Sequence, residues 1–167
     1  NRHKVGINTA SANKLVLEAI YNKVIRSLQG YSTVRKEVPY GVQNSRIDIL
    51  LEDMVNNQCR RCFVEVKNVS LGIGDGMGLF PDAVTKRGQK HMQELIEIAS
   101  VGDRAVLLFC VQHEGINQVY PADDIDPEYG RLLRQAEAAG VEIQAYGTEF
   151  DIDTSTLSIK QELSVII

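Results

Sequence analysis

Two apolar stretches joined by a polar segment decide the fold of this chain: Arg46-Ile47-Asp48-Ile49-Leu50-Leu51 and Phe63-Val64-Glu65-Val66-Lys67-Asn68-Val69. Both are rich in β-branched residues and alternate in polarity, which is typical of strands. The middle of the polar segment is Asn56-Asn57, and asparagine tolerates the positive φ that tight hairpin turns require. We therefore expect a β-hairpin whose strands pair about this dipeptide.

The register of this hairpin brings two acidic side chains together. A turn centred on Asn56-Asn57 places Asp48 directly opposite Glu65, so that both side chains project from one face of the sheet. Lys67 follows on that face because strand side chains alternate with a period of two residues. The other face would carry the apolar pairs Ile47–Val66 and Ile49–Val64.

Two carboxylates that face each other repel unless a positive charge lies between them. A divalent metal ion with Lys67 beside it meets this requirement, and a structural salt bridge to Lys67 meets it as well. The residues of the hairpin leave both interpretations open.

Length and composition indicate a single globular domain. The chain has 167 residues, of which 44% are hydrophobic and 24% charged. No apolar run approaches the roughly 20 residues that span a membrane. The net charge of −4 argues against nucleic-acid binding through overall charge and leaves a local basic patch open. Three cysteines, an odd number, suit a reducing compartment better than a disulfide framework.

The remaining periodicities place helices and further strands around the hairpin. We expect helices at 11–28, 85–99 and 126–139, strands at 33–40, 104–112, 141–146 and 157–163, and a mobile loop at 71–79, where glycine occupies every second position from Gly72 to Gly78. This order predicts the α/β class, with a hairpin-bearing mixed sheet flanked by helices.

Two of these helices carry charged or polar residues at notable positions. Gln89 lies on the apolar stripe of the helix at 85–99, and a cationic cluster surrounds its first turns: Lys86, Arg87 and Lys90. Cations gain nothing from the helix dipole at that end, so the cluster serves either an external anion or solubility. Glu18, at the border of the stripe of the first helix, is either solvated or an additional acid.

An aspartate on one strand and Glu-x-Lys on the next resembles the PD-(D/E)xK, restriction-endonuclease-like pattern. Two carboxylates offer the hard oxygen ligands that Mg²⁺ or Mn²⁺ prefers, and the metal polarises a phosphate and activates water. The lysine can orient hydroxide or stabilise the charge that develops on phosphorus. Pro81-Asp82 follows Glu65 and Lys67 in the chain and is therefore not the motif's own Pro-Asp pair.

More narrowly, the chain resembles the sugar fermentation stimulation protein (SfsA) family from about Asn8 to Tyr146. The resemblance rests on Ser45-Arg46-Ile47-Asp48, Val64-Glu65-Val66-Lys67-Asn68-Val69 and Phe80-Pro81-Asp82-Ala83-Val84-Thr85-Lys86-Arg87-Gly88-Gln89-Lys90-His91. It implies a bacterial or archaeal cytoplasmic protein with a nuclease-like architecture and DNA-binding character, linked to sugar (maltose) utilisation. It also implies an N-terminal OB-like domain ahead of this region. We expect residues 1–167 to be the nuclease-like domain alone, in keeping with a first residue, Asn1, that is not Met.

Three functions compete. A Mg²⁺- or Mn²⁺-dependent nuclease would use Asp48 and Glu65 as metal ligands with Lys67, Gln89 and Glu18 in the catalytic site, and we expect Gln89 to reach toward Glu65 and Lys67. A catalytically silent DNA-binding regulator would contact phosphates through Lys86, Arg87, Lys90 and Arg35. The third is a regulatory or scaffold role without DNA, and a homodimer is left open. The presence of both carboxylates, Asp48 and Glu65, favours metal chemistry, because without a metal two facing carboxylates would lack an obvious compensating charge.

Overall fold

The computed structural model of the chain describes residues 3–6, 11–40 and 45–167. Its helices are α1 (Ala12–Tyr21), α2 (Lys86–Ser100) and α3 (Pro127–Ala138), with a short 3-10 turn η2 (Arg26–Leu28) after α1. Its strands are β1 (Thr33–Tyr40), β2 (Ser45–Val55), β3 (Gln58–Val69), β4 (Leu71–Gly74), β5 (Met77–Phe80), β6 (Arg104–Val111), β7 (Gln118–Pro121), β8 (Glu142–Asp151) and β9 (Thr156–Val165).

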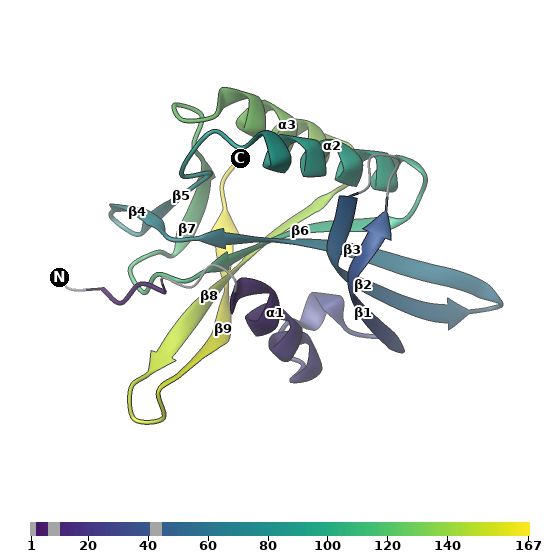
Figure 1. The fold of residues 1–167 in the computed structure, drawn as a ribbon, viewed down its shortest axis with the longest axis horizontal. Coiled ribbons are helices and arrows are strands. Elements are labelled where there is room, and N and C mark those ends of the chain that lie inside the picture. Colours follow the sequence, from purple (N-terminus) through teal and green to yellow (C-terminus); the bar gives the residue numbers. More distant parts are fainter. Residues whose placement is uncertain (1–2, 7–10, 41–44) are drawn as a thin grey trace.

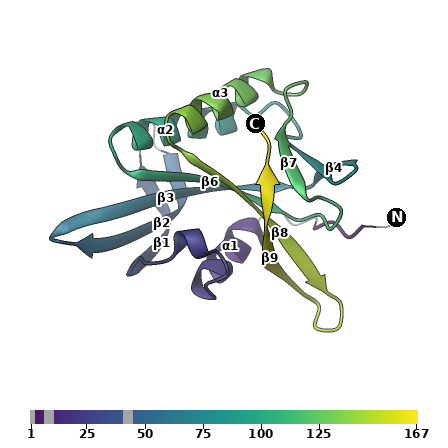
Figure 2. The same cartoon turned by 180° about the vertical axis from the view of Figure 1, so that it is seen from behind.

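A mixed sheet with the strand order β1-β2-β3-β6-β8-β9-β7-β5-β4 organises the described residues. The pairs β1–β2, β2–β3 and β8–β9 are antiparallel, whereas β3–β6 and β6–β8 are parallel. Helices α2 and α3 lie side by side over one face, and α1 lies on the other (Figures 1 and 2). This arrangement confirms the predicted α/β class.

Each face of the sheet has its own hydrophobic cluster. Leu107 and Phe109 of β6 pack with Leu95 of α2, and Val106 and Leu108 pack with the residues of α1. Strand β6 is buried from Ala105 to Val111, which confirms the predicted strand covered on both faces. Strand β6 pairs in parallel with β3 and also packs against α2. The position of α2 relative to β3 is therefore fixed through β6.

The register of the central hairpin is confirmed from Ile49–Val64 to Val55–Gln58. Asn56 and Asn57 form its turn with φ of 51° and 62°, the left-handed conformation that this kind of turn requires.

Near Asp48 the regular pairing fails, and the predicted apolar pair Ile47–Val66 is wrong. Ile47 packs in the cluster beneath α2, whereas Val66 packs in the cluster on the α1 side. The pairing of β1 with β2 is interrupted at Glu37 and Asp48, although the residues before and after them are paired. Glu37 has φ of 51°. A local distortion of both strands therefore changes the direction of the Asp48 side chain, as irregular strands beside functional sites often do.

The first helix is shorter than predicted because it ends in a Schellman motif. Lys23 adopts φ of 59°, its amide donates to Ile20 O (3.1 Å), and the amide of Val24 donates to Ala19 O (2.9 Å). These bonds satisfy the last carbonyls of α1. The helix consequently ends at Tyr21 and not near Leu28.

The segment 71–79 is a hairpin and not the predicted mobile loop. Strands β4 and β5 join through Asp75 and Gly76, both at positive φ. A Cβ on Gly78 would lie 2.7 Å from the Ile116 side chain, so glycine permits the close packing of this hairpin against the segment that leads into β7. Strand β7 itself was not predicted.

The other predicted helices and strands are confirmed. Most of their observed ends lie within a few residues of the predicted ends. Thr85 caps α2 by accepting from the amide of Gly88 (3.0 Å), and Asp126 caps α3 by accepting from the amide of Tyr129 (3.0 Å). All three cysteines are free. No helix in the described part of the chain is long and apolar enough to cross a membrane.

The hairpin turn gives a test of the register. Asn57→Val places a β-branched residue at positive φ, so the free energy of unfolding should fall by about 1–2 kcal/mol, measured by urea denaturation. Asn57→Gly should cost little, because glycine adopts this conformation freely. Equal losses in the two variants would contradict the backbone explanation.

Candidate functional site

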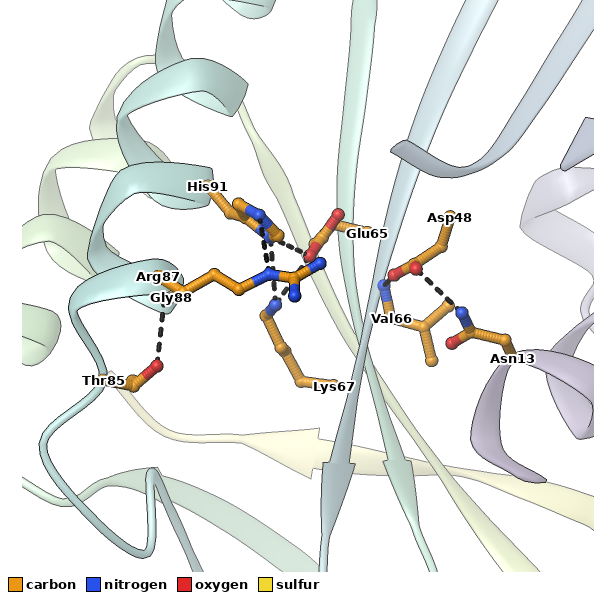
Figure 3. Close-up of polar contacts among 9 residues, drawn as sticks. All are labelled: Asn13, Asp48, Glu65, Val66, Lys67, Thr85, Arg87, Gly88 and His91. Atoms are coloured by element: carbon orange, nitrogen blue, oxygen red, sulfur yellow. Dashed lines mark hydrogen bonds and ion pairs between the residues drawn. The ribbon is translucent and has the colours of Figure 1, made fainter. Parts of the chain in front are cut away.

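Glu65 of β3 is the centre of the candidate site. Its side chain is 2% exposed, and its Oε1 accepts from Lys67 Nζ at 2.6 Å and from Nδ1 of His91. Its Oε2 is buried and has no hydrogen-bond partner within the described part of the chain. Figure 3 shows Lys67 and His91 converging on this carboxylate. Among the described residues, one oxygen of Glu65 therefore has two protein partners and the other has none.

The charge on Glu65 is stabilised despite its burial. Burial alone would raise the pKa of the Glu65 carboxyl, but the hydrogen bond with His91 and the ammonium of Lys67 lower it below its usual value. The site thus keeps a buried carboxylate ionised, as a ligand for a hard cation must be.

Asp48 lies next to Glu65 but makes its contacts on the other side of β3. Its Oδ2 accepts from the Val66 amide (2.7 Å) and its Oδ1 accepts from Asn13 Nδ2 of α1 (2.7 Å), as Figure 3 shows. Strand amides point within the plane of the sheet, so the carboxylate of Asp48 takes the place of a β2 carbonyl there. Burial, followed by the charge on Glu65, raises the pKa of Asp48.

This geometry corrects the prediction that Asp48 and Glu65 project side by side from one face. Simple alternation fails at Asp48 because β1 and β2 are distorted there, and its carboxylate bonds instead to the amide of the residue that follows Glu65. The charge on Glu65 still acts on Asp48, because after burial it is the next contribution that raises the pKa of Asp48. Among the described residues, no group of three or more His, Cys, Asp and Glu is placed to hold a metal ion. A cation at this point would take its other ligands from water or from a phosphate, as Mg²⁺ commonly does.

His91 is the site residue that sequence reasoning missed. Its Nδ1 contacts Glu65, and Arg87 Nε donates to its Nε2 at 3.4 Å. The signal was present, since His91 lies one helical turn after Arg87 and one turn before the buried Leu95. Reasoning from the apolar stripe considered only Thr85 and Gln89.

Gln89 is buried as predicted, but its partner differs from the predicted one. Its Nε2 donates to Asp126 Oδ1 and Oδ2 (2.8 and 3.0 Å), and its Oε1 accepts from Lys86 Nζ (3.2 Å). Asp126 also accepts from the amides of Thr85 and Tyr129. Gln89 therefore joins α2 to the N-terminal cap of α3 and does not reach toward Glu65 and Lys67.

Two other predicted residues lie away from Glu65. Glu18 is exposed on α1 and pairs with Lys14 at 3.7 Å, whereas Asn13 of α1 donates to Asp48. Arg35 is exposed on β1 and pairs with Glu52 at 3.4 Å. The structure does not bring either residue to the candidate site.

The cationic cluster of α2 lines a cavity that adjoins the acidic site. This cavity, of about 540 Å³, is bordered by Glu37, Ser45, Arg46, Lys86, Arg87, Lys90 and His91. It unites the three predicted cations and adds Arg46, whose Nη1 donates to Glu37 O at 2.8 Å. His91 belongs both to this basic cavity and to the surroundings of Glu65.

A mixed sheet flanked by helices, with an aspartate and Glu-x-Lys on adjacent strands, defines a restriction-endonuclease-like α/β protein. The chain belongs to the sugar fermentation stimulation protein (SfsA) family: the family described as "Sugar fermentation stimulation protein RE domain" matches residues 10–154. Relatives described as sugar fermentation stimulation protein homologues include those of Shewanella woodyi, 54% identical over 92% of this chain, and Saccharophagus degradans, 52% identical over 93%.

A solved structure agrees with this assignment. The structure of Pyrococcus furiosus SfsA in complex with Ca²⁺ is 28% identical in sequence and superposes with a TM-score of 0.83 over 98% of this chain and 68% of that one. The chain spans 64% and 65% of the lengths of the Shewanella woodyi and Saccharophagus degradans relatives. The family and the fold are therefore established over nearly the whole of this chain.

The contacts of Gln89 predict a structural effect. Gln89→Leu removes two bonds from the buried Asp126, so the free energy of unfolding should fall by about 1–3 kcal/mol, measured by urea denaturation. Divalent-metal affinity, measured by calorimetry, should stay unchanged. Gln93→Leu, an exposed position on the same helix, is the matched control. A loss of metal affinity in Gln89→Leu without a loss of stability would instead place Gln89 in the metal site.

Proposed function

We propose that this chain is the nuclease-like part of a DNA-binding protein that hydrolyses phosphodiester bonds with Mg²⁺ or Mn²⁺ and is linked to sugar utilisation. The observation that carries the proposal is the buried Oε2 of Glu65, which has no hydrogen-bond partner among the described residues and belongs to an ionised carboxylate beside Lys67. A buried polar atom normally has a partner. A hard cation is a partner that suits a carboxylate oxygen.

In this proposal the cation takes two protein ligands, both of them carboxylates of the kind that a hard cation prefers. Glu65 would hold it through Oε2, and Asp48 through the remaining lone pairs of a carboxylate that Val66 and Asn13 already orient. When bound, the metal would polarise a phosphoryl oxygen and lower the pKa of a bound water. The Pyrococcus furiosus SfsA structure, which is in complex with Ca²⁺, supports divalent-metal binding in a relative.

Lys67 is suited to the phosphate. Its ammonium is anchored on Glu65 Oε1 at 2.6 Å, and its side chain is 16% exposed. This anchoring fixes a positive charge before substrate arrives, which is the condition for stabilising charge that develops during a reaction. In the proposed reaction Lys67 faces the phosphate group under attack.

The DNA backbone would lie along the basic cavity. Lys86 and Arg87 are exposed and Lys90 is half-buried, and Arg46 joins them across the cavity. Contacts of this kind position nucleic acid without reading its sequence. A chain of net charge −4 would bind DNA through this local patch.

A second candidate is a catalytically silent DNA-binding regulator of sugar metabolism. It is favoured by the protein partners that the acids already have, because Glu65 accepts from Lys67 and His91, and both oxygens of Asp48 accept hydrogen bonds. In that case the same network would be structural, and DNA binding would not require a metal.

Metal titration and cleavage assays separate the two candidates. Calorimetry with Mg²⁺ and Mn²⁺, and cleavage of single- and double-stranded DNA, should show binding and metal-dependent hydrolysis by the wild type. Glu65→Gln and Asp48→Asn should weaken metal binding by about tenfold or more and abolish cleavage, because each removes a ligand charge. Glu162→Gln, an exposed position on β9, should change neither.

The outcomes are distinct. Metal binding without cleavage would favour the silent regulator. Absence of metal binding by the wild type would overturn the proposed metal site.

DNA affinity should depend on the α2 cluster. Reversing Lys86, Arg87 and Lys90 to Glu should weaken DNA binding at low salt and reduce the slope of log K against log salt by about 0.9 for each phosphate that the variant no longer neutralises. Lys160→Glu, an exposed lysine of β9 paired with Glu149, is the matched control. An unchanged affinity and slope would return the cluster to a role in solubility.

A further inference from the structure

A continuous chain of contacts connects the basic cavity with the carboxylate of Glu65. Arg87, exposed on α2, donates through Nε to His91 Nε2 at 3.4 Å, and His91 Nδ1 contacts Glu65 Oε1. His91 is only 5% exposed and Glu65 is 2% exposed. In Figure 3 dashed lines link the imidazole of His91 both to Arg87 and to Glu65.

The hydrogen-bond chemistry of these groups fixes the role of each imidazole nitrogen. A guanidinium only donates hydrogen bonds, so Nε2 of His91 is the acceptor for Arg87. The ring proton therefore lies on Nδ1, which donates to Glu65 Oε1. Lys67 Nζ lies 3.3 Å from Nδ1, but an ammonium is also only a donor. Lys67 and His91 thus both donate to the same oxygen of Glu65.

Both donors bond to Oε1, and Oε2 has no hydrogen-bond partner in the described part of the chain. Because Oε1 is held by one group from β3 and one from α2, the carboxylate cannot turn without breaking one of the two bonds. The hydrogen bond from a buried neighbour to a ligating carboxylate commonly changes metal affinity by about 10- to 100-fold.

We infer that His91 is a positioning residue that couples phosphate binding at Arg87 to cation binding at Glu65. The inference rests on the proposed function, since it concerns the same metal and DNA sites. A phosphate that orders Arg87 also orders His91, and His91 orders Glu65. Because coupling between two binding sites is reciprocal, DNA should raise the affinity for the cation and the cation should raise the affinity for DNA.

Substitution of His91 by asparagine or by glutamine separates its two functions, donation to Glu65 and acceptance from Arg87. The amide nitrogen of asparagine lies the same number of bonds from Cα as Nδ1, and the amide group of glutamine lies the same number of bonds from Cα as Nε2. His91→Asn therefore keeps a donor for Glu65 and loses the acceptor for Arg87. His91→Gln keeps the acceptor and loses the donor.

The experiment is a Mn²⁺ titration by calorimetry with and without a short DNA duplex whose linkages are phosphorothioates, so that the duplex keeps its charge and resists the cleavage proposed above. We expect the wild type to bind Mn²⁺ about fivefold or more tightly with DNA present. His91→Asn should keep the DNA-free affinity within about threefold and lose the DNA effect. His91→Gln should lose about tenfold or more of the DNA-free affinity. Arg87→Gln, a change at an exposed position, should behave like His91→Asn.

Controls and contrary outcomes complete the test. His113→Gln, outside both sites, should leave all values unchanged, and thermal melts report whether each variant is folded. If His91→Asn and His91→Gln lower Mn²⁺ affinity equally, or if DNA has no effect on the wild type, the inference is overturned while the metal site stands. If the wild type binds no Mn²⁺, the proposed function itself is overturned together with this inference.

Discussion

The buried carboxylate of Glu65 is the constraint on which the site depends. Removing an ionised carboxylate from water costs several kcal/mol unless the protein supplies partners. Here one partner, Lys67, comes from the same strand, and the other, His91, comes from α2. The position of α2 over the sheet therefore determines whether the Glu65 carboxylate of β3 has its second hydrogen-bond donor. The same helix carries Arg87 and Lys90 to the rim of the adjoining cavity, so one packing arrangement places Glu65 beside these cations.

A second constraint is the distortion of β1 and β2. A residue other than glycine at positive φ costs about 1–3 kcal/mol, and such strain persists where the surroundings enforce it. Glu37 is such a residue, and Glu37 and Asp48 are both missing from the otherwise regular pairing of these strands. With regular alternation, Asp48 would project from a face of the sheet. The distortion instead brings its carboxylate to the Val66 amide and to Asn13 of α1. All three layers of the fold thus contribute to the surroundings of the two acids.

The sequence was sufficient for the register of the hairpin and insufficient for the orientation of Asp48. The turn at Asn56-Asn57 determines which residues pair, but alternation holds only while the ladder is regular, and no local pattern reveals where two strands distort together. The same limit applies to Gln89: its helical position predicted burial, whereas its partner Asp126 belongs to a distant segment. His91 was missed because helical periodicity locates a face and not the acid opposite it. The glycines of segment 71–79 predicted a loop because glycine is also a turn residue, whereas Gly78 serves packing against Ile116.

The positive charges at the start of α2 differ in whether a nearby negative charge compensates them. Cations near a helix N-terminus are unfavourable with respect to the helix dipole. Lys86 is compensated, because it donates to Gln89 and its charge helps to lower the pKa of Asp126, whose burial would otherwise raise it. Arg87 instead donates a hydrogen bond to the imidazole of His91, which is a neutral acceptor in the tautomer that the contacts require. The Arg87 side chain remains exposed. A neutral acceptor orients a cation without cancelling its charge. The structure therefore retains an exposed positive charge at Arg87, one hydrogen bond away from the histidine that donates to Glu65.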